Sequence, residues 1–133
     1  LWSTDVGNAY LETVTHEKAC FIAGPEFGEL EGRTLLIYKA QCGLRSSGKR
    51  WHEKLHNILR YMGFFPSMAD EDIWMRDMGD HYDCLAVCVD DLMIASKNPK
   101  AIVDALMGAH KLKLKGTGPT TFHLGCDNFR DND

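Results

Sequence analysis

The sequence predicts an α+β fold in one domain, with a mainly antiparallel sheet packed on helices. Short runs rich in β-branched and aromatic residues alternate with glycine- and proline-containing turns, which is typical of strands. Two longer stretches instead carry apolar residues at helical spacing. The length of 133 residues is enough for one hydrophobic core, and a 44% hydrophobic, 26% charged composition is that of a soluble globular chain.

Three strands are expected in the first 41 residues. The segment LWSTDV (1–6) predicts a strand that ends near Asp5. The segment KACFIAG (18–24) stops at a Gly-Pro pair, and RTLLIYKAQ (33–41) is broken by the GLRSSGK stretch. These apolar, β-branched runs bounded by turn residues favour strands over helices.

Two helices are expected next. Residues 47–62 place apolar side chains three and four positions apart, and Gly63 suits a C-terminal cap. Residues 98–112 begin with Asn98 as a candidate N-cap and Pro99 at the first helical position.

A hairpin is expected between the helices. The apolar segments DCLAVCV (83–89) and LMIAS (92–96) flank Asp90 and Asp91, so we expect both carboxylates at the hairpin tip. The turn lacks the usual Asn-Gly or Asp-Gly pair. Residues 72–76 form a further short strand candidate, and TTFHLGCDNF (120–129) is strand-like.

Charge and cysteine usage narrow the class. A net charge of −4 counts against a self-sufficient nucleic-acid binder, although basic residues cluster at 45–54 and 110–115. We interpret the acidic run 69–83 as a solvated loop. Five cysteines without a C-x-x-C pair indicate reduced thiols in an intracellular protein, and we expect Cys84 and Cys88 to pack on one buried strand face. No apolar run approaches the length of a membrane span.

The stretch RWHEKLHNIL (50–59) contains the His-Glu-x-x-His pattern of zinc proteases. His52 and His56 share a helical face, and Glu53 would be the general base. The extended motif fails because it has no third histidine, and no helical spacing places Glu71 as the third ligand. A zinc hydrolase is therefore one hypothesis; two solvated or partly packed histidines on an ordinary helix are the simpler interpretation.

The aspartates suggest a different metal chemistry. Nucleotidyl transfer uses two Mg²⁺ ions, which prefer carboxylate oxygens held on rigid neighbouring strands. Asp90 and Asp91 at a hairpin tip suit this purpose, and Asp5 at another strand end is the candidate third carboxylate. An adjacent Asp pair alone is common in exposed turns, so a structural role is the alternative.

Five segments occur together in one order: DVGNAYLE (5–12), YKAQCGLRSSGKRWHEKL (38–55), YMGFFPSMADEDIW (61–74), CLAVCVDDLMIAS (84–96) and FHLGC (122–126). This set resembles the reverse transcriptase of copia-type retrotransposons, whose pattern runs D-V-x-x-A-F/Y-L, K-A-L-Y-G-L-K-Q-A-P-R-x-W, G-F-x-x-S-x-x-D, Y-V-D-D and F-L-G. The helix after the glycine loop reads R-x-W-x-x-x-L in that family, so His52 and Glu53 would be ordinary variation on it.

The resemblance implies a polymerase palm with a ferredoxin-like core and part of the fingers, an RNA-directed DNA polymerase that uses two Mg²⁺ ions, with Mn²⁺ as a possible substitute. Asp5 and Asp90 would be the main catalytic metal ligands, with Asp91 aimed less directly at the ions. The implied nucleotide-binding residues are Val6, Ala9, Tyr10, Gly43 and Arg45. The implied primer-grip residues are Phe122, His123, Leu124 and Gly125.

The resemblance also implies partners and location. They are a primed RNA or DNA template, dNTPs, and the integrase and RNase H of a Pol polyprotein, in a cytoplasmic virus-like particle with a nuclear integration stage and no membrane. Residues 1–133 would be a fragment without thumb or RNase H. Cys88 replaces the Tyr or Phe that precedes Val-Asp-Asp, and Ser46-Ser47-Gly48 replaces Gln-Ala-Pro. A catalytically inactive relic is therefore an alternative, and a small interaction domain without metal is another.

Overall fold

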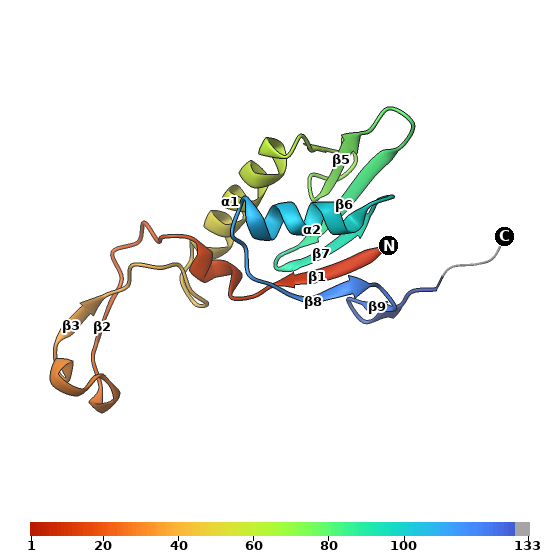
Figure 1. Ribbon diagram of the computed structural model, residues 1–133. Helices are drawn as coiled ribbons and strands as arrows, with labels where there is room; N and C mark the ends of the chain where they lie inside the picture. Colours follow the sequence, from red (N-terminus) through yellow and green to blue (C-terminus); the bar gives the residue numbers. More distant parts are fainter. Residues whose placement is uncertain (130–133) are drawn as a thin grey trace. The chain divides into compact units, whose positions relative to one another are not determined.

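The computed structural model describes residues 1–129 and divides the chain into two compact units (Figure 1). The first unit combines Leu1–Asn8 with Leu55–Asp133, and the second is Ala9–Lys54. Each unit is described by itself below. Within residues 1–129, no helix is both long enough and apolar enough to cross a bilayer.

A six-stranded antiparallel sheet forms the first unit, in the order β4-β5-β6-β7-β1-β8 (Figure 1). The strands are β1 Trp2–Val6, β4 Phe65–Pro66, β5 Ile73–Asp77, β6 Tyr82–Cys88, β7 Asp91–Ala95 and β8 Leu114–Pro119. The expected α+β class with an antiparallel sheet is confirmed. The first strand of the sequence lies inside the sheet, between β7 and β8.

One face of this sheet is buried, because apolar side chains alternate along its strands. Leu92 and Ile94 on β7 are fully buried, and Leu85 occupies the same layer on β6. Helix α2, Pro99–Gly108, adds Ile102 and Leu106 to the core. The opposite sheet face carries the alternate residues, and it is therefore the face on which polar groups can gather.

Helix α2 starts where the sequence indicates. The side chain of Asn98 accepts a hydrogen bond from the Ala101 N–H at 3.3 Å, and Pro99 follows at the first helical position. Since an N-cap satisfies one of the orphan amides of the first turn, this confirms the expected cap. The helix ends at Gly108, four residues earlier than expected.

The second unit contains short elements around a small core. They are the 3₁₀ segments η1 Ala9–Glu12 and η2 Pro25–Leu30, the strands β2 Cys20–Ile22 and β3 Thr34–Leu36, and the first part of helix α1, Ser47–Tyr61. Ser47 Oγ donates to the Gln41 carbonyl at 2.7 Å and accepts from the Gln41 amide at 3.1 Å, which ties the start of α1 to the preceding loop. α1 then continues unbroken into the first unit, and Gly63 follows it with a left-handed φ of 86°.

Strand boundaries in several places differ from the expectations. The strands expected at 18–24 and 33–41 are only three residues each. Most of their side chains are exposed, and the two strands pair only with each other. The segment 120–129 forms two 2-residue strands, β9 Phe122–His123 and β10 Cys126–Asp127. The expectation missed β4 and β8, whose sequences contain proline, glycine and lysine and so lack the apolar pattern of a strand.

Two environments were also expected wrongly. The acidic run 69–83 is not a solvated loop: it contains β5 and the start of β6, with Trp74 and Asp83 buried. Cys84 is half-buried and Cys88 is exposed, so these thiols do not share a buried face. Both lie on the open face of the sheet, opposite the Leu85 layer. All five cysteines are free, as expected.

A buried ion pair joins β5 and β6 next to the end of α1. Arg76 donates to the Asp83 carboxylate at 2.8 Å and to the Met62 carbonyl at 3.1 Å, and its guanidinium lies 4.5 Å from the centre of the Phe64 ring. Burial opposes ionisation of Asp83, but hydrogen bonds from Ser96 and Arg76 outweigh it and hold the Asp83 pKa below its usual value of 3.8. One arginine thus satisfies a helix-end carbonyl and a buried carboxylate.

We predict that Asp83→Asn lowers the free energy of unfolding by about 2 to 3 kcal/mol at neutral pH. This is less than for a fully buried pair, because the Arg76 side chain is 25% exposed. A depressed pKa contributes stability above pH 3.8 that is lost as pH falls through the folded-state pKa. Urea unfolding should therefore show the difference from wild type shrinking in acid. Asp104→Asn, which removes an exposed i,i+4 pair with Lys100, should change stability by only about 0.5 kcal/mol.

Candidate active site

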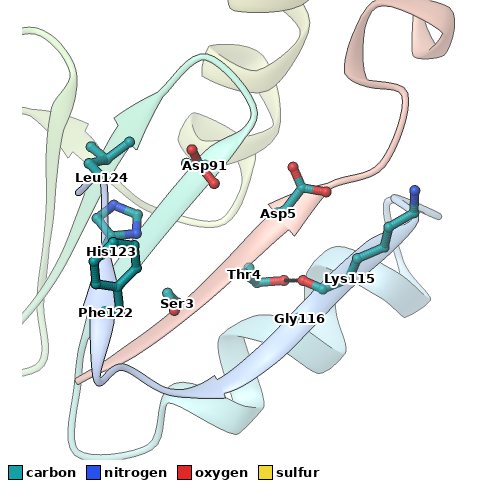
Figure 2. Close-up of a pocket in the computed structure, with 9 residues that line it drawn as sticks. All are labelled: Ser3, Thr4, Asp5, Asp91, Lys115, Gly116, Phe122, His123 and Leu124. Atoms are coloured by element: carbon teal, nitrogen blue, oxygen red, sulfur yellow. Dashed lines mark hydrogen bonds between the residues drawn. The ribbon is translucent and has the colours of Figure 1, made fainter. Parts of the chain in front are cut away.

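A row of four side chains crosses the open face of the sheet. Asp5 on β1 pairs with Asp91 on β7, Asp91 pairs with Cys88 on β6, and Asp5 pairs on its other side with Lys115 on β8. Directly paired residues of antiparallel strands point to the same face, so two carboxylates lie between a thiol and an ammonium. Figure 2 shows Asp5 and Asp91 on neighbouring strands, with Lys115 on the far side of Asp5.

The turn between β6 and β7 consists of Val89 and Asp90. Val89 has φ of +55°, whereas Asp90 is not among the positive-φ residues, which is the pattern of a type II′ turn. Glycine is the residue that this first position favours, and a β-branched side chain is strained there. The Asp90 carbonyl accepts the Val6 amide at 2.8 Å, so β1 holds the turn from the side.

The carboxylates act on one another. Burial raises the pKa of Asp5 above its usual value, and the negative charges of Asp90 and Asp91 raise it further. The Lys115 ammonium opposes these effects. Asp5 and Asp91 on paired strand positions, with Asp90 in the adjoining turn, therefore form a site of excess negative charge, which a divalent cation would relieve.

Gly7 leaves the space in which the Lys115 side chain lies. A Cβ atom at position 7 would stand 2.6 Å from Lys115 Cε and 3.3 Å from the Lys113 carbonyl. The backbone of β8 is tied to β1 by the Gly7 amide, which donates to Lys113 at 2.8 Å, and by the Thr4 hydroxyl, which donates to the Lys115 carbonyl at 3.1 Å. These contacts hold the lysine beside Asp5.

A pocket of about 270 Å³ opens over this row. Its lining residues come from β1, β7, β8, β9 and the β9–β10 turn: Ser3, Thr4, Asp5, Asp91, Lys115, Gly116, Phe122, His123 and Leu124. In Figure 2 the β9 side chains stand on the side of the pocket near Asp91, and Lys115 stands on the side near Asp5. The pocket therefore combines two carboxylates with a lysine, an imidazole and an apolar wall.

The three predicted metal ligands have different surroundings. Asp5 and Asp91 line the pocket, whereas Asp90 belongs to the turn. Only Asp90 is at the tip that was expected to carry both carboxylates, because Asp91 already pairs as the first residue of β7. Asp91 faces Asp5 across the strands. The expectation that Asp91 is aimed less directly at the ions than Asp90 stays a prediction.

The carboxylate oxygens of Asp5, Asp90 and Asp91 do not lie close enough together to coordinate one metal ion. Within residues 1–129, the three aspartates do not make a group whose ligand oxygens all lie within 4.8 Å of one another. Like charges favour separated rotamers, and the backbones of Asp5 and Asp91 are already directly opposed.

The remaining predicted residues fall into three groups. Phe122, His123 and Leu124 line the pocket, whereas Gly125 forms the β9–β10 turn with φ of +82°. Val6 is fully buried, on the sheet face opposite Asp5. Ala9, Tyr10, Gly43 and Arg45 belong to the second unit, where Ala9 is buried and both Gly43 and Arg45 are exposed, and their nucleotide-binding role stays a prediction.

Sequence reasoning missed Lys115, Ser3 and Thr4. Ser3 carried a signal, because it lies two residues before Asp5 in a predicted strand and must share its face. Lys115 lies in the basic cluster at 110–115, but its pairing with Asp5 could not be predicted. That pairing depends on β8, whose glycines and proline hide the strand pattern.

The second motif, HEKLH, lies on α1. Glu53 forms ion pairs with two cations: its carboxylate lies 3.2 Å from the Arg50 guanidinium and 3.9 Å from the Lys49 ammonium. Both cations are on the same helix, one turn away or less. A carboxylate engaged in this way is poorly placed to serve as a general base, so the geometry does not favour the zinc hydrolase hypothesis.

Comparison with known proteins adds the family. The model of the family "Reverse transcriptase (RNA-dependent DNA polymerase)" matches residues 1–133. The chain is similar to the retrovirus-related Pol polyprotein from transposon RE1 of Arabidopsis thaliana, with 26% identity over 95% of the chain and 9% of that protein. It is also similar to a putative transposon Ty5-1 protein of Saccharomyces cerevisiae, with 28% identity over 72% of the chain and 32% of that protein.

A third relative is the corresponding polyprotein from transposon RE2 of Arabidopsis thaliana, with 24% identity over 95% of the chain and 9% of that protein. The chain thus spans between a tenth and a third of the length of the curated relatives it matches. No solved structure matches it.

We predict that Val89→Gly raises the melting temperature by a few degrees. Relief of a strained β-branched residue is worth about 1 to 3 kcal/mol, and the added freedom of glycine in the unfolded chain offsets about 0.5 to 1 kcal/mol of it. Calorimetry measures the difference. The control is Val87→Gly, on β6 two residues before the turn and without positive φ, which should lower the melting temperature. A lower melting temperature for Val89→Gly would show that the turn is not strained.

Proposed function

We propose that this chain, which belongs to the reverse transcriptase (RNA-dependent DNA polymerase) family, carries the carboxylates for template-directed nucleotidyl transfer in a copia-type retrotransposon polymerase. Asp5, Asp90 and Asp91 would hold two Mg²⁺ ions, with Mn²⁺ as a substitute. The observation that supports this most is the direct pairing of Asp5 with Asp91 beside a strained turn that carries Asp90.

The donor set suits a hard divalent cation. The three proposed ligands, Asp5, Asp90 and Asp91, offer carboxylate oxygens, which Mg²⁺ and Mn²⁺ prefer. The raised pKa of Asp5 is consistent with this, because burial and then the negative charges of Asp90 and Asp91 disfavour its ionised form when no cation is bound. When bound, such ions stabilise the attacking and leaving oxygens of an in-line phosphoryl displacement.

The other pocket residues would position the reactants. Lys115 keeps a positive charge next to Asp5, where it favours the ionised carboxylate and can meet a phosphate oxygen. Phe122, His123 and Leu124 form the wall against which a primer end would rest, and Gly125 turns the hairpin that carries them. Val6 has a fully buried side chain, so only its backbone is proposed to contact an incoming nucleotide. A nucleotide-binding role is proposed for Ala9, Tyr10, Gly43 and Arg45 as well.

Partners follow from this role. The substrates would be dNTPs and a primer on an RNA or DNA template, and two relatives are named as Pol polyproteins. We propose that residues 1–133 form the palm and part of the fingers, and that thumb, integrase and RNase H belong to other parts of such a polyprotein. The net charge of −4 supports this division, because phosphate binding then depends on basic surfaces outside this chain.

We predict that Asp5→Asn has opposite effects on stability and on metal binding. A carboxyl with a raised folded-state pKa destabilises the fold as pH rises from 3.8 through that pKa. In EDTA at neutral pH the variant should therefore melt at a higher temperature than wild type, and the gap should close below pH 3.8. Mn²⁺ affinity, measured by electron paramagnetic resonance, should fall about 10-fold or more.

Asp104→Asn is the matched control, since Asp104 is exposed on α2 and pairs only locally with Lys100. It should keep wild-type Mn²⁺ affinity and should not melt at a higher temperature. Unchanged Mn²⁺ binding in Asp5→Asn, Asp90→Asn and Asp91→Asn would contradict the proposed metal site.

We predict that the 133-residue chain alone does not extend a primer, because its net charge of −4 disfavours binding of a primed template. A longer polyprotein segment that includes the flanking reading frame should extend a primed template, and Asp90→Asn should abolish extension. Extension by the chain alone, above that of its Asp90→Asn variant, would overturn the first expectation. Stop codons or frameshifts in the flanking frame, or an inactive longer segment that still binds Mn²⁺, would favour the relic.

A further inference from the structure

Strand β8 has one residue more than β1 between two of their paired positions. The register of the two strands shifts between Ser3 and Asp5. Thr4 therefore lies opposite both Gly116 and Thr117, which is the arrangement of a β-bulge. Gly116 has a left-handed φ of 58°, the conformation of the first residue in a G1 bulge. β1 and β8 both belong to the first unit, so the bulge is formed within that unit.

The bulge decides which face of the sheet each β8 side chain takes. Side chains alternate along a regular strand, so residues 115 and 118, three positions apart, would point to opposite faces. The bulge lets both residues pair on the open face. Lys115 pairs there with Asp5, and Gly118 pairs with Ser3. The lysine thus faces the carboxylate while β8 continues toward β9.

Thr4 fastens the bulge from the opposite strand. Its hydroxyl donates to the Lys115 carbonyl at 3.1 Å (Figure 2) and lies 2.7 Å from the Thr117 hydroxyl. Because a hydroxyl has a single proton, and that of Thr4 goes to the carbonyl, Thr117 is the donor of the second bond. Thr4 is only 3% exposed, so its hydroxyl is shielded from water and depends on these protein partners.

The Lys115 side chain is confined as well as its backbone. A Cβ atom on Gly7 would stand 2.6 Å from Lys115 Cε and 3.1 Å from Lys115 Nζ, so the side chain passes close to the Gly7 backbone. Burial and the charges of Asp90 and Asp91 raise the pKa of Asp5, and the Lys115 ammonium opposes them. The ammonium therefore acts on Asp5 from the position in which the bulge holds it.

We propose that Thr4 is a positioning residue of the candidate active site. Through its bond to the Lys115 carbonyl in the bulge, it keeps the Lys115 ammonium beside Asp5. Lys115 is then a built-in counter-ion, which compensates the carboxylates before a divalent cation binds and repels that cation when it arrives. The inference deepens the proposed function and rests on it, because the counter-ion matters to the reaction only if Asp5 is a metal ligand.

The first test is Mn²⁺ binding to the 133-residue chain, measured by electron paramagnetic resonance. Lys115→Met should raise Mn²⁺ affinity about 3-fold or more, because a cation beside the site repels another cation. Thr4→Val keeps the shape of the buried side chain and loses the hydroxyl. It should raise Mn²⁺ affinity as well, and it should have no further effect when combined with Lys115→Met. Damage to the fold alone would instead lower the affinity in both backgrounds.

Two further variants control this test. Thr4→Ser retains the hydroxyl, so it should bind Mn²⁺ like wild type. Gly116→Ala disturbs the bulge by another route, because no atom of the described residues lies within 4 Å of the added Cβ and the change acts through the φ of 58°. It should reproduce the effect of Thr4→Val, and it decides the question if Thr4→Val does not fold.

The second test needs no metal and separates this inference from the proposed function. In EDTA at neutral pH, Lys115→Met should lower the melting temperature of wild type more than that of Asp5→Asn, because the ammonium compensates the Asp5 charge. Thr4→Val and Gly116→Ala should each reduce that difference by about half or more. A difference that is absent in wild type, or undiminished in both variants, would overturn the inference. A wild-type chain that does not bind Mn²⁺ would contradict the proposed metal site, whereas the melting comparison would still decide the role of Thr4.

Discussion

The pairing of β1 with β7 is the constraint on which the rest of this molecule depends. It sets Asp5 opposite Asp91 and brings the Val6 amide to the Asp90 carbonyl. The same strand pairs with β8 on its other edge, which adds Lys115 to the row. Because side chains alternate along a strand, a shift of one residue would place Asp5 in the core and Val6 in the pocket. The buried Val6, Leu92 and Ile94 make that shift costly, so packing on one face fixes the chemistry on the other.

The carboxylates of Asp5, Asp90 and Asp91 are placed together at some expense of folding stability. They concentrate negative charge beside a strained Val89. A bound cation would relieve the repulsion between them. His56 lies in a different environment, with its ring edge-on to the buried Trp74 and its Nε2 atom 3.4 Å from Asp72 Oδ1.

Sequence patterns predicted the parts of the fold in which local signals agree with tertiary packing. Both helices, the Asn98 cap and the hairpin around the aspartates had periodicity or turn chemistry that tertiary contacts supported. β8 was missed because glycine and proline conceal its pairing, and the lysine beside Asp5 was missed with it. The partners of His56 and Asp83 could not be predicted either, since long-range proximity leaves no periodic trace in one sequence. The acidic run 69–83 was misinterpreted for the same reason, because the burial of its Trp74 and Asp83 depends on tertiary contacts.

The central position of β1 also has a consequence for the order of folding. Its neighbours in the sheet, β7 and β8, lie more than 80 residues later in the chain, and each contact of this kind closes a long loop. High contact order of this type slows folding, and strand edges stay unpaired until the intervening residues have folded. During synthesis on the ribosome, β1 must wait for β7 and then β8 to emerge. The row of Asp91, Asp5 and Lys115 is therefore among the last features to assemble. A truncated product without β8 would expose the edge of β1 to association with other chains.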